Sequence, residues 1–69
     1  MTPQAAIQIA LALHAQTKDP LLLDSIRLLH ELLTDQHCRP DHTPTPLQQA
    51  ALNLVQNSKN AADILGIDV

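Results

Sequence analysis

The segment DPLLLDSIRLLHELLTDQ, residues 19–36, decides the fold of this chain. Asp19 is a preferred N-cap residue, and Pro20 suits the first helical position, where its missing N–H is not needed. After them, apolar residues recur at the i, i+4, i+7 and i+11 spacing of a core-facing helix seam. The seam consists of Leu22, Ile26, Leu29 and Leu33. We therefore expect a central helix over residues 20–36, about 25 Å long at about 1.5 Å per residue.

A second apolar row of the same segment lies beside this seam. It consists of Leu21, Leu28 and Leu32. The opposite side of the helix carries charged residues three or four positions apart, namely Asp24, Arg27, Glu31 and Asp35. Exposed ion pairs at this spacing add only about 0.2–0.5 kcal/mol each, so the charged side is expected to face water. The second apolar row is the part of this helix that we assign to a contact surface.

Residues 3–16 form another helical segment, with Thr2 as its expected N-cap. At about 100° per residue, its apolar residues span roughly 200° of the circumference, twice the stripe of about 100° that a surface helix needs. Such a helix requires cover on two sides, and we assign Ile9 and Leu13 to a contact surface. His14 falls in the apolar sector, where a rim or core imidazole bonded to a carbonyl is the expected role. A pH-sensitive interface contact is the alternative.

Residues 37–46 read HCRPDHTPTP and predict a loop. Its three prolines keep the residues before them away from helical backbone angles, so the loop should be stiff and extended. Thr45 then caps a further helix over residues 46–57, with Gln48 placed for the reciprocal hydrogen bond of a capping box. The loop over residues 37–46 is therefore followed by a helix whose first residue is well defined.

The helix over residues 46–57 is expected to turn Leu47, Ala51 and Leu54 inward. Two possibilities stay open at its C-terminal end. Either the helix stops near Asn57 and a short fourth helix follows over residues 58–65, or one bent helix runs through. In both cases Gly66 is the expected stop.

The composition fits an all-α protein. The chain has 69 residues and a mass of 7.5 kDa, with thirteen Leu, nine Ala and five Ile but two Val and no aromatic residue. This selection favours helices over sheets. We expect a single domain, residues 1–69, built as a small bundle of three main helices with a possible short fourth.

The charge and the cysteine count exclude several functional classes. A net charge of −3 with four Lys and Arg leaves no basic surface for a phosphate backbone, so nucleic acid is not an expected partner. No apolar run approaches the roughly 20 residues of a membrane span, and the start MTPQAA lacks the features of a signal peptide. One cysteine cannot form an internal disulfide. Together these observations predict a cytoplasmic protein with no membrane partner.

A metal site in the loop region is one alternative function. Thiolate and imidazole are zinc ligands, and the three-residue gap between Cys38 and His42 is a permissible ligand spacing. The candidate ligands are His30, His37, Cys38 and His42, with Asp41 beside them. Paired cysteine motifs, which structural zinc sites usually show, are missing from the sequence. A solvated polar loop is therefore the preferred interpretation, and no metal or other cofactor is expected.

Enzyme activity is not expected, and no catalytic residue is assigned. Cys38 could pair with His37 or His42, but adjacent side chains rarely face one another. Gly66 is the only glycine, so the sequence contains no glycine-rich phosphate loop. A chain of this size also lacks the bulk to enclose a substrate pocket of roughly 300–1,000 Å³.

Residues 57–67, NSKNAADILGI, resemble the first half of a Fis-type helix-turn-helix, whose pattern is N-x-x-x-A-A-x-x-L/M-G-I. The resemblance implies that Asn57 ends the preceding helix, that Gly66 makes the turn and that Ile67 enters the core. The base-reading helix of that family would follow residue 67, so no residue is carried over as a DNA contact. A nucleic-acid-associated regulator derived from this motif is the other alternative function.

Surplus apolar surface is the strongest functional indication in the sequence. In chains below about 70–80 residues a single core rarely contributes more than about 3–5 kcal/mol, and small natural proteins add disulfides, metals or oligomerisation. We therefore expect a bacterial or phage-type interaction module, acting as a regulator, inhibitor or adaptor. It would present apolar helix faces to a larger protein or pair with itself as a two-fold homodimer. The expected contact residues are Ile9, Leu13, Leu21, Leu28 and Leu32.

Overall fold

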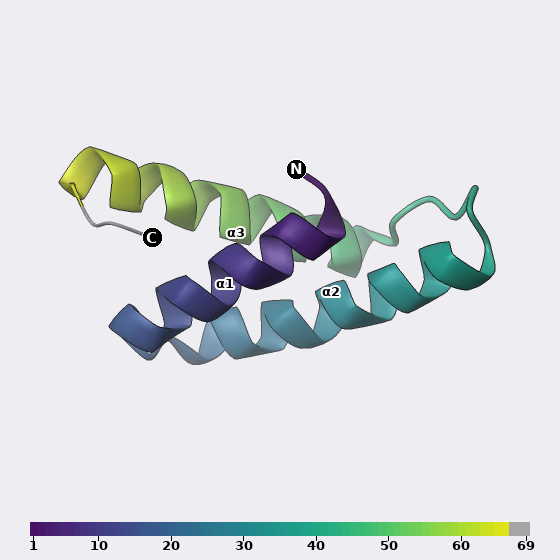
Figure 1. Cartoon of the computed structure of the whole chain (residues 1–69), viewed down its shortest axis with the longest axis horizontal. Coiled ribbons are helices and arrows are strands. Elements are labelled where there is room, and N and C mark those ends of the chain that lie inside the picture. Colours follow the sequence, from purple (N-terminus) through teal and green to yellow (C-terminus); the bar gives the residue numbers. More distant parts are fainter. Residues whose placement is uncertain (67–69) are drawn as a thin grey trace.

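The structure is a computed structural model that describes residues 1–66. These residues form three helices, α1 (Pro3–Thr17), α2 (Pro20–Cys38) and α3 (Pro46–Leu65), and contain no strand. The expected all-α bundle is thereby confirmed. A tight turn reverses the chain between α1 and α2, and α3 returns along α2 after the loop. In Figure 1, α1 lies in front of the layer that α2 and α3 form.

Every helix starts with the same local device, an N-cap oxygen followed by a proline. Thr2 and Asp19 each accept a backbone N–H hydrogen bond, at 3.2 and 3.0 Å. At the start of α3, Thr45 Oγ1 accepts from Gln48 N at 3.2 Å, while Gln48 Oε1 accepts from Thr45 N at 3.0 Å. The predicted capping box is thus confirmed, and these caps fix three helix starts to the residue.

Left-handed backbone conformations end α1 and α3. Lys18 (φ 58°) turns the chain from α1 into α2, and Gly66 (φ 78°) caps α3 as the sequence predicted. Glycine adopts this conformation without a steric penalty, and the Gly66 N–H donates to Asp63 O at 3.2 Å. The second helix runs to Cys38, so the prediction that the loop begins at residue 37 is wrong by two residues.

A single helix spans both segments that the sequence left open, so the separate fourth helix over residues 58–65 is not present. Asn57 and Ser58 are helical, and the implied helix end at Asn57 is wrong. The reason is tertiary: Val55 and Ala62 flank this point and are both buried, at 0% and 4% exposure. The burial of Val55 and Ala62 stabilises the helix by more than the low helix propensity of Asn57 and Ser58 destabilises it.

Two adjoining apolar clusters make up the core. The larger one joins all three helices around Leu29, Leu32 and Val55, the three largest fully buried side chains. The smaller one contains Leu13, Leu22 and Ala62 and lies where the α1–α2 turn meets the second half of α3. The core therefore runs along the bundle axis. In the smaller cluster at its end, α3 contributes only the methyl group of Ala62.

Several inward and outward assignments made from the sequence are wrong. Leu32 was expected at the surface but is 0% exposed, because α3 packs on its side of α2 and places Ala51 and Val55 in the same cluster. Leu33 was expected in the core but is 37% exposed. On α3 the buried row contains Gln48, Ala51, Val55 and Ala62. The expected inward residues Leu47 and Leu54 are exposed and half-buried, respectively.

A polar cluster fastens the loop to the helix ends. Gln48 is 3% exposed, and its Nε2 donates to Asp35 Oδ2 at 3.2 Å. His42 Nε2 lies 3.3 Å from Gln48 Oε1 and 3.6 Å from Asp35 Oδ2. No buried side-chain nitrogen or oxygen in residues 1–66 lacks a hydrogen-bond partner. The cluster sets the register between the end of α2 and the start of α3.

Candidate interaction surface

A shallow apolar groove lies between α2 and α3, on the side of these helices away from α1. It has a volume of about 180 Å³. From α2 it is lined by Leu21, Asp24, Ser25 and Leu28, and from α3 by Leu47, Ala50, Ala51 and Leu54. Leu21 is 56% exposed and Leu47 is 69% exposed, so the two lips of the groove are large apolar side chains in water.

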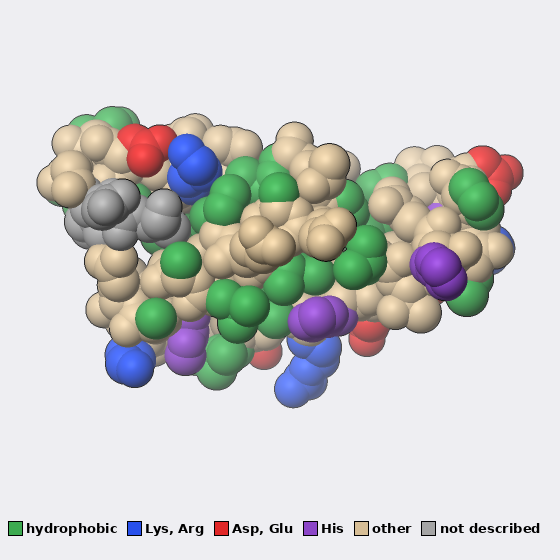
Figure 2. All heavy atoms as spheres, in the orientation of Figure 1, with side chains coloured by type: hydrophobic (Ala, Val, Ile, Leu, Met, Phe, Trp, Pro, Cys, Tyr) green, Lys and Arg blue, Asp and Glu red, His purple; other side chains and the backbone are tan. Residues whose placement is uncertain are grey.

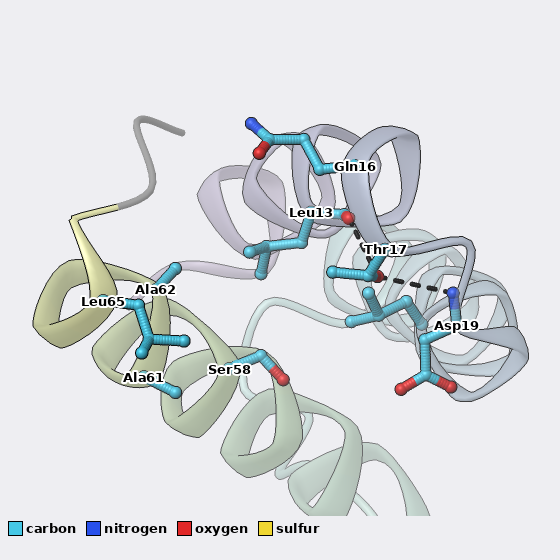
Figure 3. Close-up of a pocket in the computed structure, with 9 residues that line it drawn as sticks. Leu13, Gln16, Thr17, Asp19, Ser58, Ala61, Ala62 and Leu65 are labelled. Carbon is cyan, nitrogen blue, oxygen red and sulfur yellow. Dashed lines mark hydrogen bonds between the residues drawn. The ribbon is translucent and has the colours of Figure 1, made fainter.

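A second hollow of about 210 Å³ opens where the α1–α2 turn faces the last turns of α3. In Figure 3, Leu13 and Thr17 point from one side towards Ala62 and Ser58 on the other. Thr17 Oγ1 donates to Leu13 O at 3.0 Å and lies 3.4 Å from Asp19 N, so the rim on the α1–α2 side is held by hydrogen bonds. Leu65, 75% exposed, forms part of the opposite rim.

The two hollows follow each other along one stripe of α3. Leu47, Ala50, Ala51 and Leu54 line the first, and Ser58, Ala61, Ala62 and Leu65 line the second. Successive members are one, three or four positions apart, so they share one face of the helix. From the first to the last, the α3 stripe covers about 27 Å at about 1.5 Å per residue. A helical partner of similar length would match it.

Charged side chains avoid this stripe. Residues 46–58 of α3 contain none, and the two charged residues that follow, Lys59 and Asp63, pair with each other at 3.0 Å. The carboxylates that border the hollows, Asp19 and Asp24, come from the start of α2. Depletion of charge with retained large apolar side chains distinguishes the centre of a protein interface from ordinary surface.

The face over α1 is the other apolar surface of the molecule. Figure 2 shows hydrophobic side chains gathered across its middle, with the charged ones towards its edges. Residues 3–17 contain no Asp, Glu, Lys or Arg, and Leu11 is 53% exposed. However, Ile9 and Leu52 on this side already pack against the core, and neither hollow opens onto its middle. Residues 3–17 therefore contribute one large hydrophobic side chain to the exposed set, Leu11, whereas the α2–α3 groove is lined by two, Leu21 and Leu47.

The structure divides the predicted contact residues into three groups. Leu21 and Leu28 line the groove between α2 and α3. Ile9 is half-buried and packs against both core clusters. Leu13 and Leu32, at 3% and 0% exposure, belong to the core, so their assignment to an exposed contact surface is wrong.

Sequence reasoning missed the α3 side of the groove. Leu47, Leu54 and Leu65 are large apolar residues of one face, and their spacing signalled that face correctly. The error was to read the row richest in leucine as the inward row. The buried row instead contains Gln48 and Val55, and the burial of Gln48 is possible because Thr45 and Asp35 satisfy its amide.

The candidate metal ligands do not form a cluster in the described structure. Residues 1–66 contain no group of three or more His, Cys, Asp or Glu side chains that could hold an ion. His30, His37 and Cys38 are exposed on α2, whereas His42 turns towards Asp35 and Gln48.

The segment that resembles a helix-turn-helix, residues 57–67, extends one residue beyond the part of the chain that the structure describes. Gly66 does end a helix, but Asn57 lies inside α3, and Ile67 falls beyond residue 66. Comparisons with protein-family models, curated proteins and solved structures found no match to this chain. Within residues 1–66, no helix has both the length and the apolar character needed to cross a bilayer.

Proposed function

We propose that this chain is a protein-interaction module that binds an apolar helix face in the groove between α2 and α3. The observation that carries the proposal is the set of large apolar side chains left in water beside the two hollows. Leu21 and Leu47 on the groove and Leu65 on the rim of the second hollow are each more than half exposed. At about 25 cal/mol per Å² of apolar surface, covering such side chains is a substantial driving force for association.

The size of the hollows favours side chains of a protein over a small molecule. Their volumes of about 180 and 210 Å³ lie below the roughly 300–1,000 Å³ of small-molecule pockets. Two shallow hollows in a row along one helix face suit successive anchors of an amphipathic helix at i, i+3, i+4 and i+7. The role is then that of a regulator, inhibitor or adaptor that acts by occupying or presenting a helix.

The number of exposed large apolar side chains agrees with this role. Eight large hydrophobic side chains among the described residues are at least 37% exposed. A chain without internal disulfides gains stability when a partner covers such a surface.

Affinity capture from the native host, with matched variants, tests the proposal. Leu47→Asp places a carboxylate in the first turn of α3, where the helix dipole favours it, but also on the lip of the groove. Leu23→Asp is the matched control, because Leu23 is 51% exposed near the start of α2 and borders neither hollow.

We expect the wild type and Leu23→Asp to retain the same proteins, including untagged copies of the chain itself, and Leu47→Asp to lose them. Retention of the same proteins by all three would refute binding through the groove. Far-UV circular dichroism must show equal helicity in the three proteins for the comparison to count.

A further inference from the structure

We infer that the occupant of the α2–α3 groove is a second copy of this chain, joined through antiparallel α3 helices about a two-fold axis. This inference rests on the proposed function and adds the identity of the partner. It follows from the order of residues along the α3 stripe, from its lack of charge and from the size of the face.

The α3 stripe reads almost the same in both directions. Its spacings are symmetric about the level of Gln56, so an antiparallel copy places Leu47 against Leu65 of the second copy, and Leu65 against Leu47. These two leucines are among the most exposed in the molecule, at 69% and 75%. A two-fold interface requires a self-complementary patch of this kind, since the same residues meet from both sides.

The inner positions of the stripe are complementary in size. Ala50 and Ala61 are exposed, and in the antiparallel pairing each lies at the level of an alanine of the second copy, at 62 or 51, that is already packed in its own core at 4% or 3% exposure. No large side chain therefore keeps the two backbones apart at these levels. Leu54 meets Ser58 of the second copy, a large side chain against a small one, on both sides of the axis. Alternating large and small residues across facing positions is the arrangement that fills an interface without voids.

Electrostatics permit this pairing although each chain carries a net charge of −3. The stripe itself brings no charged group to the centre, and Lys59 is neutralised by Asp63 at 3.0 Å in its own chain. Asp19 and Asp24 stand on the α2 edge of the hollows rather than on α3. The α3 stripe therefore contributes no carboxylate to the centre of the contact, and the exposed Asp24 lies on the α2 side of the groove.

The face approaches the size of a standard dimer interface. The molecule extends over 37 × 19 × 18 Å, so one long face fits within a rectangle of roughly 700 Å², against about 800 Å² per partner in a standard interface. The relief of the two hollows adds accessible surface to that flat area. A contact restricted to the stripe would be smaller, so the flanking α2 residues Leu21 and Leu28 belong to the interface as well.

Cys38 provides a direct test of the arrangement because it is the chain's single cysteine and is exposed. It lies at the end of α2 near the start of α3, as the Asp35–Gln48 hydrogen bond requires. Antiparallel α3 helices place the two Cys38 residues at opposite ends of the dimer, at least about 30 Å apart from the helix rise. Parallel helices place both at the same end.

The experiment is pulsed electron–electron resonance on the nitroxide-labelled wild-type chain, with sedimentation equilibrium over a dilution series. We expect a dimer with one narrow inter-spin distance of at least about 30 Å. Leu47→Asp should weaken dimerisation by about a hundredfold or more, because pairing would bury two unpaired carboxylates, and Leu23→Asp should leave it unchanged.

Three outcomes would overturn the inference: a monomer at every concentration, a dimer with a short Cys38–Cys38 distance, or equal effects of the two variants. The first outcome leaves the proposed function intact if capture of a different protein still depends on Leu47. If that capture is also insensitive to Leu47→Asp, both the proposed function and the inferred dimer are wrong. Circular dichroism of each labelled protein excludes unfolding as the cause of a lost distance.

Discussion

Gln48 Nε2 donates a hydrogen bond to Asp35 Oδ2 across 3.2 Å and so fixes the start of α3 against the end of α2. The same side chain closes the capping box with Thr45 and is 3% exposed. This one buried amide therefore aligns the two helices whose outer sides form the groove. The register between α2 and α3 and the shape of the groove between them therefore both depend on the Gln48–Asp35 hydrogen bond.

Replacing this amide should cost stability. We expect Gln48→Ala to lower the free energy of unfolding by about 1–3 kcal/mol, because it removes the capping-box acceptor of the Thr45 N–H and the amide that donates to Asp35 Oδ2. Gln49→Ala is the control, since Gln49 is exposed and its side chain donates to Asn53 Oδ1 at 3.1 Å, within α3 itself. Its cost should stay below about 0.5 kcal/mol. Urea denaturation followed by circular dichroism measures both; equal costs would contradict the account of the cluster.

The observed core boundary on α2 makes a second prediction. Leu29 is 0% exposed and Leu33 is 37% exposed, although both belong to the same sequence seam. We expect Leu29→Ala to cost about 2–5 kcal/mol through the cavity it leaves, and Leu33→Ala to cost clearly less. Thermal melting of the two variants distinguishes them. A larger loss for Leu33→Ala would mean that α1 and α3 cover α2 differently.

Continuity of α3 gives a third prediction. Because Asn57 is exposed inside a continuous helix, Asn57→Ala should stabilise the protein by up to about 0.7 kcal/mol through helix propensity alone. If the helix broke at this residue, the same change would remove a favourable cap and destabilise the protein. The sign of the change in the urea midpoint decides between the two, and amide exchange at residues 56–60 gives an independent reading.

The exposed thiol should be dispensable for the fold. Cys38 is exposed, and the described residues bring no cluster of metal ligands around it. We expect Cys38→Ser to change the free energy of unfolding by no more than about 0.5 kcal/mol. A chelator should likewise leave the melting temperature unchanged. Stoichiometric zinc in elemental analysis of the wild type, lost in Cys38→Ser, would instead support the metal alternative.

The fold could be read from the sequence where local chemistry decided it. Thr2, Asp19 and Thr45, each followed by proline, fixed the helix starts, and Gly66 fixed the last helix end. The continuity of α3 could not be read in this way. It depends on Val55 and Ala62 being buried on either side of Asn57, which is a tertiary effect.

The candidate site was only half predictable for a related reason. Periodicity places residues on a common face but does not say which face meets the core. Leu21 and Leu28 were correctly placed outside the seam, whereas Leu32, in the same row, is covered by α3. On α3, the buried polar residue Gln48 takes a position that hydrophobicity alone would give to Leu47. Its satisfied amide allows Gln48 to be buried in the same row as Ala51, Val55 and Ala62.

The most direct test of the central claim is a residue-resolved ¹⁵N–¹H spectrum recorded over a wide concentration range. We expect the amides along the α3 stripe from Leu47 to Leu65, together with those of Leu21 and Leu28, to shift with concentration, and those around Leu11 on α1 to stay unchanged. Concentration-dependent shifts centred on α1, or none along the groove, would contradict the pairing of two copies of this chain through the α2–α3 groove.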